Sequence, residues 1–290
     1  MAKTNMAINS MERLSSMEKR QNLFHLKTIK MKKDTIVGRP IRLNQQTLVP
    51  KKGQNYAEVI FIGDVHYGSP QCDIPRFLKM LTYCLKNSIY VFLMGDLLEL
   101  ATRNSVGAGV YEQEFIGQNQ YEQMIEWLMP LADRKLIIGS LNGNHEARAY
   151  IQTGIDVGKM IARELKVKYL GDACWNNFKV GKENYKIYTL HGRTGSRFDG
   201  TALLALERIS TSFFADGVFC GHSHKCINSI VLMQYVVNGV VKEHKKHLLI
   251  TGHHVKYDGG YGQTLGLPIS KLGSPKVKFW SNNHDILISW

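Results

Sequence analysis

The stretch IFIGDVH, residues 60–66, begins as a short apolar run and ends in an aspartate and a histidine. Short apolar runs rich in β-branched and aromatic residues are typical of strands buried on both faces. Four further stretches follow the same pattern, with an apolar run beside a polar motif. They are FLMGD at 92–96, NGNHE at 142–146, YTLHG at 188–192 and FCGHSH at 219–224. We therefore predict buried strands that carry polar side chains at their carboxyl ends.

Helical patterns separate these predicted strands. Asp73 is a candidate N-cap and Pro75 falls in the first turn of a helix whose apolar residues recur at helical spacing up to residue 85. Similar patterns cover residues 124–131 and 157–165. Alternating strands and helices predict an α/β fold with a largely parallel sheet, whose ligands bind at the carboxyl ends of the strands. Residues far apart in the sequence are thus expected to meet at one edge.

The composition is consistent with a single catalytic domain and an extension. The chain has 290 residues, of which 44% are hydrophobic, enough for a sizeable core. We predict a basic, partly disordered N-terminal extension over residues 1–55 and a catalytic domain over residues 56–290. A hairpin is expected over residues 229–252, turning at Asn238-Gly239. A final strand is expected near Ile286 and Ile288.

The expected location is the cytoplasm. No apolar run approaches the roughly 20 residues needed to span a bilayer, and the N-terminus lacks the apolar core of a signal peptide. The five cysteines are odd in number and show no CxxC spacing, which indicates reduced thiols rather than a disulfide framework. No membrane partner is expected, and the sequence leaves the oligomeric state open.

Positive charge is concentrated near the N-terminus. The net charge is +13, and residues 1–55 hold twelve lysines and arginines against three acidic residues. One interpretation is a solubilising tail. The other is an arm that contacts nucleic acid or another polyanion, because phosphate contacts dominate such binding. The sequence does not separate them.

The five motifs together resemble the calcineurin-like metallophosphoesterases. That family has the ordered pattern D-x-H, G-D-x-x-D, G-N-H-[DE], H and G-H-x-H, and the resemblance covers roughly residues 57–226. It implies an α/β fold in which a two-sheet β-sandwich is flanked by helices, with a pair of metal ions at one edge. It also implies that Asp64, His66 and His224 bind the first ion, that Asp96 bridges both, and that Asn144, His191 and His222 complete the second site. His145 would be the catalytic residue.

Such a site suits hydrolysis of a phosphoester substrate. Two divalent ions about 3.5–4 Å apart clamp phosphoryl oxygens and lower the pKa of a bridging water, which becomes the hydroxide nucleophile. Mixed imidazole and oxygen ligands suit Mn²⁺, our first choice, and also Fe, Zn²⁺ or Ni²⁺, better than Mg²⁺. His145 would stabilise charge or protonate the leaving oxygen. Glu146 is expected to orient a ligand or an arginine from outside the metal shell.

We expect the subclass to be a phosphodiesterase, with a DNA or RNA nuclease favoured. The motif at 221–224 has the double histidine that resembles phosphodiesterases and repair nucleases. The motif at 95–99 lacks the arginine of protein Ser/Thr phosphatases and has Glu99 where aspartate is common. A phosphomonoesterase and a non-catalytic nucleic-acid-binding subunit of the same fold are the alternatives. The second is disfavoured because no ligand is missing.

Several other polar residues remain ambiguous. Arg103, Arg193 and Arg197 are either phosphate contacts or surface arginines. His253 and His254 follow a predicted strand and either approach the site or belong to the core. The remaining histidines lie among polar or basic neighbours and are expected at solvated positions: His25, His244, His247 and His284.

Overall fold

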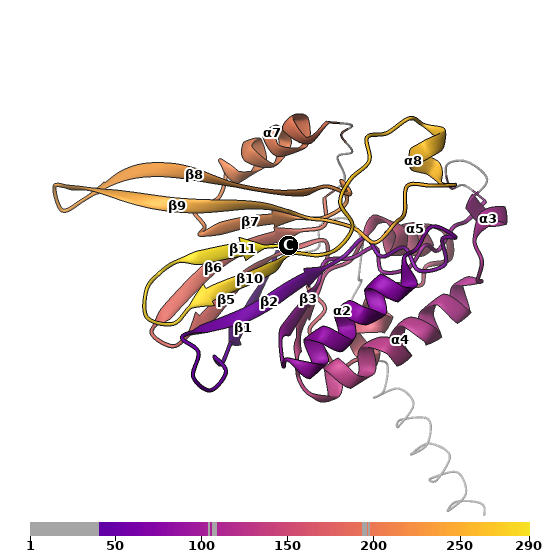
Figure 1. Ribbon diagram of the computed structural model, residues 1–290, viewed down its shortest axis with the longest axis horizontal. Coiled ribbons are helices and arrows are strands. Elements are labelled where there is room, and N and C mark those ends of the chain that lie inside the picture. Colours follow the sequence, from indigo (N-terminus) through magenta and orange to yellow (C-terminus); the bar gives the residue numbers. More distant parts are fainter. Residues whose placement is uncertain (1–40, 104, 106–108, 193–195, 197) are drawn as a thin grey trace, which may run out of the picture. The chain divides into compact units, whose positions relative to one another are not determined.

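The computed structural model describes residues 41–103, 105, 109–192, 196 and 198–290 (Figure 1). Most of the predicted extension, residues 1–40, lies outside the described residues, and the domain described below begins at Ile41. The predicted extension runs to residue 55 and so includes a strand, Arg42–Thr47, that belongs to one of the sheets.

Two β-sheets form the framework. The six-stranded sheet has the order β1 (Arg42–Thr47), β5 (Ala173–Val180), β6 (Glu183–Leu190), β7 (Gly217–Cys220), β9 (Val240–Thr251) and β8 (Cys226–Val237). The five-stranded sheet has the order β11 (Ile286–Ser289), β10 (Lys276–Trp280), β2 (Tyr56–Ile62), β3 (Tyr90–Leu93) and β4 (Ile137–Ser140). Strands β2, β3 and β4 are parallel neighbours in the five-stranded sheet, and β6, β7 and β9 are parallel neighbours in the six-stranded sheet.

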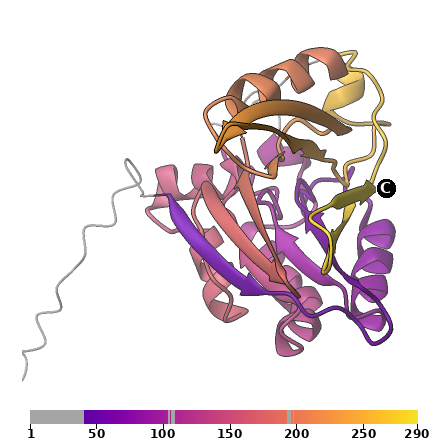
Figure 2. The ribbon, with the colours of Figure 1, turned by 90° about the vertical axis from the view of Figure 1, so that its left-hand side faces the viewer.

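The helices of the described chain flank the two sheets. They are α2 (Ile74–Lys86), α3 (Gly109–Glu112), α4 (Gly117–Asp133), α5 (Asn144–Thr153), α6 (Val157–Glu164), α7 (Asp199–Ser210) and α8 (Tyr261–Thr264). Apolar residues of α2, α4 and α6 pack on β2, β3 and β4, whereas α7 packs on the six-stranded sheet over β7, β8 and β9 (Figures 1 and 2). The α/β fold, a two-sheet sandwich flanked by helices, is therefore confirmed.

Local sequence explains most of these elements. Asp73 caps α2 by accepting a hydrogen bond from the backbone N–H of Arg76, and Pro75 lies in the first turn, as predicted. The predicted hairpin is β8–β9, and Asn238 and Gly239 have φ angles of 52° and 74°, the left-handed region that a tight hairpin turn requires. Strands β1, β5 and β10 were not predicted.

The core between the sheets is aromatic. Phe61 on β2 meets Phe219 on β7 edge to face, with ring centroids 4.9 Å apart. Phe279 on β10 similarly meets Phe178 on β5 at 5.6 Å and Tyr185 on β6 at 5.1 Å. Because the facing residues come from different sheets, these contacts fix how the two sheets stack, and hence where their carboxyl ends meet.

None of the helices among residues 41–290 that the structure describes is long and apolar enough to cross a membrane.

Replacing Phe279 by alanine should destabilise the domain by about 3–5 kcal/mol, because the side chain is fully buried and its removal leaves a cavity. Val236→Ala is the control, since Val236 is 68% exposed and its truncation should change stability by no more than about 0.5 kcal/mol. Chemical denaturation measures both. Equal effects would contradict the assignment of the inter-sheet core.

Candidate metal centre

The five polar motifs converge at the edge where strands of both sheets end. Asp64 and His66 follow β2, Asp96 follows β3, and the motif after β4 opens helix α5. From the other sheet, His191 follows β6, and the histidine pair of 221–224 follows β7. The site is therefore assembled between the two sheets, as the parallel strand ends predicted.

The backbone of these motifs is held in an unusual conformation. Non-glycine residues seldom adopt positive φ, and such residues concentrate at functional sites. Here Asp64, His66, Asp96, His222 and His224 have φ angles of 50°, 51°, 50°, 67° and 54°. Gly95 also has a positive φ, 91°, and a Cβ there would lie 2.6 Å from the backbone nitrogen of Gly143. The second and third motifs thus touch through their backbones.

One cluster joins the first and last motifs. The Nε2 atoms of His66 and His224 are 3.0 Å apart, and His224 Nε2 is 3.4 Å from Asp64 Oδ1. Asp64 is fully buried and accepts hydrogen bonds from the backbone N–H of His222 on both carboxylate oxygens, at 3.1 and 2.9 Å. These are the residues that the family resemblance assigns to the first metal ion.

A second cluster lies around His191. Its Nε2 atom is 3.0 Å from Asn144 Oδ1 and 3.2 Å from Asp96 Oδ2. The side chain of His222 is close enough to share an ion with Asp96 and His191. These four residues are the set predicted for the second metal ion.

Asp96 lies between the clusters. Its Oδ1 atom accepts the backbone N–H of His145 at 2.8 Å. Its Oδ2 atom is buried, 3.2 Å from His191 Nε2 and 3.8 Å from His66 Nε2, but it makes no hydrogen bond of normal geometry among the described residues. A buried carboxylate oxygen without a partner is costly. The surrounding imidazole nitrogens and oxygens suit divalent cations, so this donor set fits the metal pair that the family implies.

Comparison with known proteins identifies the family. A calcineurin-like phosphoesterase family model matches residues 57–226, more than half of the chain. The chain belongs to this family. No functionally curated protein matches it.

Solved structures similar to this calcineurin-like phosphoesterase are remote in sequence. One is a predicted phosphoesterase from Streptococcus pneumoniae, 13% identical, covering 81% of this chain and 90% of its own, with a TM-score of 0.36. Another is Vacuolar Protein Sorting 29 from Cryptosporidium parvum, 15% identical, covering 81% and 98%, with a TM-score of 0.40. A third is zinc-bound Vps29 from Entamoeba histolytica, 17% identical, covering 80% and 97%, with a TM-score of 0.33.

Hydrogen bonds at the far nitrogens orient two candidate ligands of the phosphoesterase. His66 Nδ1 is 3.0 Å from Glu99 Oε2, and His191 Nδ1 is 2.8 Å from the carbonyl oxygen of Met94. With the proton on Nδ1, each Nε2 presents a lone pair to the cluster, the usual arrangement for a metal-binding histidine. Glu99, the departure from the family pattern, thus contacts a ligand.

Glu146 ties the second motif to the third. Its buried carboxylate accepts the backbone N–H groups of Asp96, Leu97, Leu98 and Gly143 at 2.9–3.2 Å. Four donors on one carboxylate hold the Asp96 turn against the start of α5. Glu146 therefore orients the candidate bridging ligand through the backbone, in agreement with the sequence interpretation.

His145 lies outside the two clusters above but forms a third candidate ligand group with His66 and Glu99. Its Nδ1 atom is 2.6 Å from the carbonyl oxygen of Glu99, and its Nε2 atom is 4.0 Å from Asp96 Oδ2. Burial, together with the charge of His66, lowers the pKa of His145 to about 4. The ring is thus neutral at pH 7, with its Nδ1 proton held by the carbonyl and Nε2 available to a substrate.

Sequence reasoning missed Arg148. This half-buried arginine lies one helical turn after His145 on α5 and donates a hydrogen bond to Ser105 Oγ. Its positive charge also lowers the pKa of Glu99 and of His145, although other groups affect these two pKa values more strongly. The signal was available, because residues three apart share a helix face.

Other sequence expectations resolve differently. His253 reaches the site and stacks on His224, whereas the His254 ring contacts Ser274 and Phe77. The prediction of solvated positions was wrong for His247, which is 6% exposed, and for His244, whose Nε2 contacts the carbonyl oxygen of Ala215. His284 is partly exposed but lies between Glu183 and Asp216. Arg103 is exposed, while His25, Arg193 and Arg197 lie outside the described residues.

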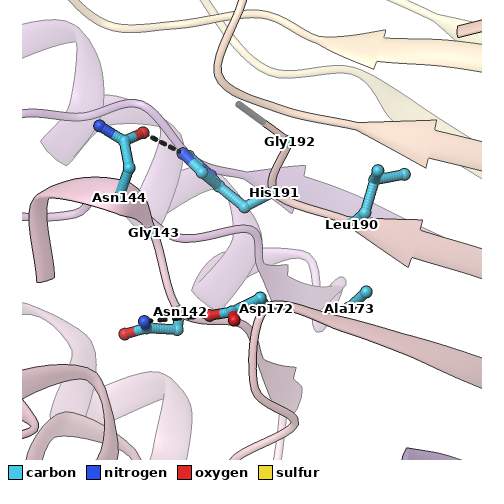
Figure 3. A pocket seen from close by; sticks show the side chains of 8 residues that line it. All are labelled: Asn142, Gly143, Asn144, Asp172, Ala173, Leu190, His191 and Gly192. Atoms are coloured by element: carbon cyan, nitrogen blue, oxygen red, sulfur yellow. Dashed lines mark hydrogen bonds between the residues drawn. The ribbon is translucent and has the colours of Figure 1, made fainter. Parts of the chain in front are cut away.

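A cavity of about 270 Å³ opens beside the second cluster. Figure 3 shows Asn144 and His191, joined by their hydrogen bond, on one side, and Asn142 and Asp172 on the other. Among the residues that the structure describes, no lysine or arginine lines it. Its acceptor-rich wall therefore suits an uncharged or donor-bearing part of a substrate more than a second phosphate.

Asp96→Asn should abolish the stabilisation that divalent metal gives the wild-type protein. Metal at 100 times its dissociation constant stabilises a protein by about 2.7 kcal/mol, which thermal melting with Mn²⁺ or with chelator detects as a change in Tm. Glu207→Gln, which changes an exposed residue of α7, is the control. An unchanged Mn²⁺ response in Asp96→Asn would contradict the central position of Asp96.

Metal binding should release protons and weaken as the pH falls. Burial opposes protonation of His66 and His191, but the surrounding carboxylates and hydrogen bonds outweigh it and raise their pKa to about 9 and about 10. Metal must displace these protons, so apparent affinity should fall steadily from pH 9 to pH 6. Calorimetry in buffers of different ionisation enthalpy measures the release. Affinity independent of pH would exclude these imidazoles as ligands.

Proposed function

We propose that the chain is a two-metal phosphodiesterase that cleaves nucleic acid. The observation that carries this proposal is the position of Asp96 Oδ2, a buried oxygen without a hydrogen bond of normal geometry among the described residues, between two clusters of imidazole and oxygen ligands. All seven candidate ligands are present, and hydrogen bonds to neighbouring groups orient the buried ones. That arrangement supports occupancy by divalent cations.

The clusters divide the candidate ligands between two ions. Asp64, His66 and His224 would hold one, and Asn144, His191 and His222 the other, with Asp96 shared. Bound divalent ions would polarise the phosphoryl oxygens and make a water nucleophilic near neutral pH. Because the donors are mainly imidazoles and carboxylates, Mn²⁺ is our first choice, with Fe, Zn²⁺ or Ni²⁺ as alternatives.

His145 would act as a general acid through its Nε2 atom. Its Nδ1 proton is fixed on the Glu99 carbonyl oxygen, so the ring orientation is set before substrate arrives. A phosphate anion beside the ring favours the protonated imidazole, and Nε2 can then donate to the leaving oxygen. Arg148, one turn further along α5, adds positive charge on the same side and would help to retain an anionic substrate.

Two features favour a diester of nucleic acid over a small monoester. The first is the double histidine of residues 222–224, which resembles phosphodiesterases and repair nucleases. The second is the net charge of +13, which attracts polyanions. A role for the basic residues before Ile41 in holding nucleic acid belongs to the same proposal. So does a cytoplasmic location, supported by five cysteines that are all free.

His145→Ala should lower the hydrolysis of bis-p-nitrophenyl phosphate by about 100-fold or more, the usual contribution of a general acid, while Mn²⁺ binding persists. The assay uses metal-stripped protein resupplied with Mn²⁺, with p-nitrophenyl phosphate and single- and double-stranded DNA and RNA as further substrates. His247→Ala, which changes a buried histidine of β9 outside the clusters, is the control.

Each outcome of that assay decides between functions. Cleavage of diesters and nucleic acid, lost in His145→Ala, supports the proposal. Hydrolysis of the monoester alone would make the protein a phosphatase. Binding of nucleic acid without turnover under any of the four metals would make it a non-catalytic subunit and overturn the proposal.

A further inference from the structure

His224 differs from His66 and His191 in how it is held. His66 and His191 are fixed at Nδ1 by Glu99 and by a backbone carbonyl. His224 has no hydrogen bond at its second ring nitrogen within the described part of the chain, and its side chain is 36% exposed. A metal-binding histidine normally donates its other N–H to a fixed partner, and His224 has no such partner among the described residues.

The ring of His253 lies flat against it. The two imidazole centroids are 5.0 Å apart and the planes differ by only 8°, whereas the other histidine pairs at the site meet edge to face. His253 is 6% exposed, so the ring it presents is itself confined. The stack covers the side of His224 that faces the turn after β9.

The backbone around His253 is anchored on several sides. The carbonyl oxygen of His253 accepts the N–H of Gly273 at 2.8 Å, and the next residue, His254, donates its N–H to the carbonyl oxygen of Asp64 at 2.9 Å. Gly252 precedes it with φ 76°, where a Cβ would lie 2.2 Å from the carbonyl oxygen of Gly273. The turn is therefore fixed directly to the first metal-ligand motif.

We propose that His253 is a positioning residue: its ring fixes the plane of His224, so that His224 Nε2 faces Asp64 and His66 and completes the first metal site. The inference rests on the proposed function, because it concerns the same metal pair. His253 does not join any of the candidate ligand groups of the described chain, so we assign it no ion of its own.

The hydrogen bonding of His253 agrees with this role. Its Nδ1 atom accepts the backbone N–H of Val255 at 3.3 Å, which leaves the proton on Nε2. That Nε2 atom is buried and has no protein partner among the described residues. An unpartnered buried N–H costs about 1–3 kcal/mol, so the position is not optimised for stability. The flat contact with His224 supplies a reason to keep a planar ring there.

Two substitutions test the proposal through metal binding. His253→Ala removes the ring and should weaken binding of the ion held by Asp64, His66 and His224 by about 10-fold or more, the usual effect of losing a support behind a ligand. His253→Phe keeps a flat ring and should stay within about 3-fold of wild type. His247→Ala, a buried histidine on the preceding strand β9, controls for general loss of packing.

Calorimetric titration with Mn²⁺ gives stoichiometry and affinity, and electron paramagnetic resonance distinguishes a coupled pair from single ions. The wild type and His253→Phe should show the coupled signal at two equivalents, and His253→Ala the signal of an isolated ion. Wild-type-like binding and spectrum in a folded His253→Ala would overturn the inference, as would equal loss in His253→Phe or His247→Ala. Failure of the wild type to bind two ions would instead overturn the proposed function.

Discussion

The organisation of this domain depends on one constraint: several imidazole nitrogens and carboxylate oxygens lie close together in a buried site. The Nε2 atoms of His66 and His224 lie 3.0 Å apart, and the carboxylates of Asp64 and Asp96 are buried beside them. Lone pairs and negative charges at such distances are unfavourable unless protons or cations intervene. In the metal-free protein, protons on His66 and His191 offset this repulsion, which is why the pKa values of both residues are raised. Bound metal ions would offset the same repulsion in place of the protons.

The framework holds this arrangement by restraints on the backbone more than on the side chains. Five candidate ligands sit at positive φ immediately after strands, and Glu146 fastens the turn at Asp96 to the start of α5 with four hydrogen bonds. The aromatic contacts between the sheets fix the two sets of strand ends relative to each other. Strain at the site is therefore sustained by packing away from it.

More of the candidate site than of the fold could be predicted from the sequence. The ligand motifs are local, each an apolar strand followed by a glycine-containing turn, so their convergence followed from the rule that parallel strands bind ligands at their carboxyl ends. Strands β1, β5 and β10 have weaker signals because each depends on long-range partners, such as Arg42 pairing with Cys174. Pairing across that separation leaves little trace in local periodicity.

Residues that act from behind the ligands were the hardest to predict. Glu146 was expected to orient a ligand, but its four backbone partners belong to segments about 50 residues apart. Arg148 carried a usable signal in its helical spacing from His145, whereas His253 carried none beyond its place after a strand. Its relation to His224 exists only in three dimensions. Sequence motifs thus identify candidate ligands, and the structure identifies what orients them.

The most direct test of the central claim is a crystal structure of the protein grown with Mn²⁺, with anomalous differences measured to locate the metal. The account predicts two peaks that share Asp96, one bounded by Asp64, His66 and His224 and the other by Asn144, His191 and His222. A single peak, or peaks away from these residues, would contradict it.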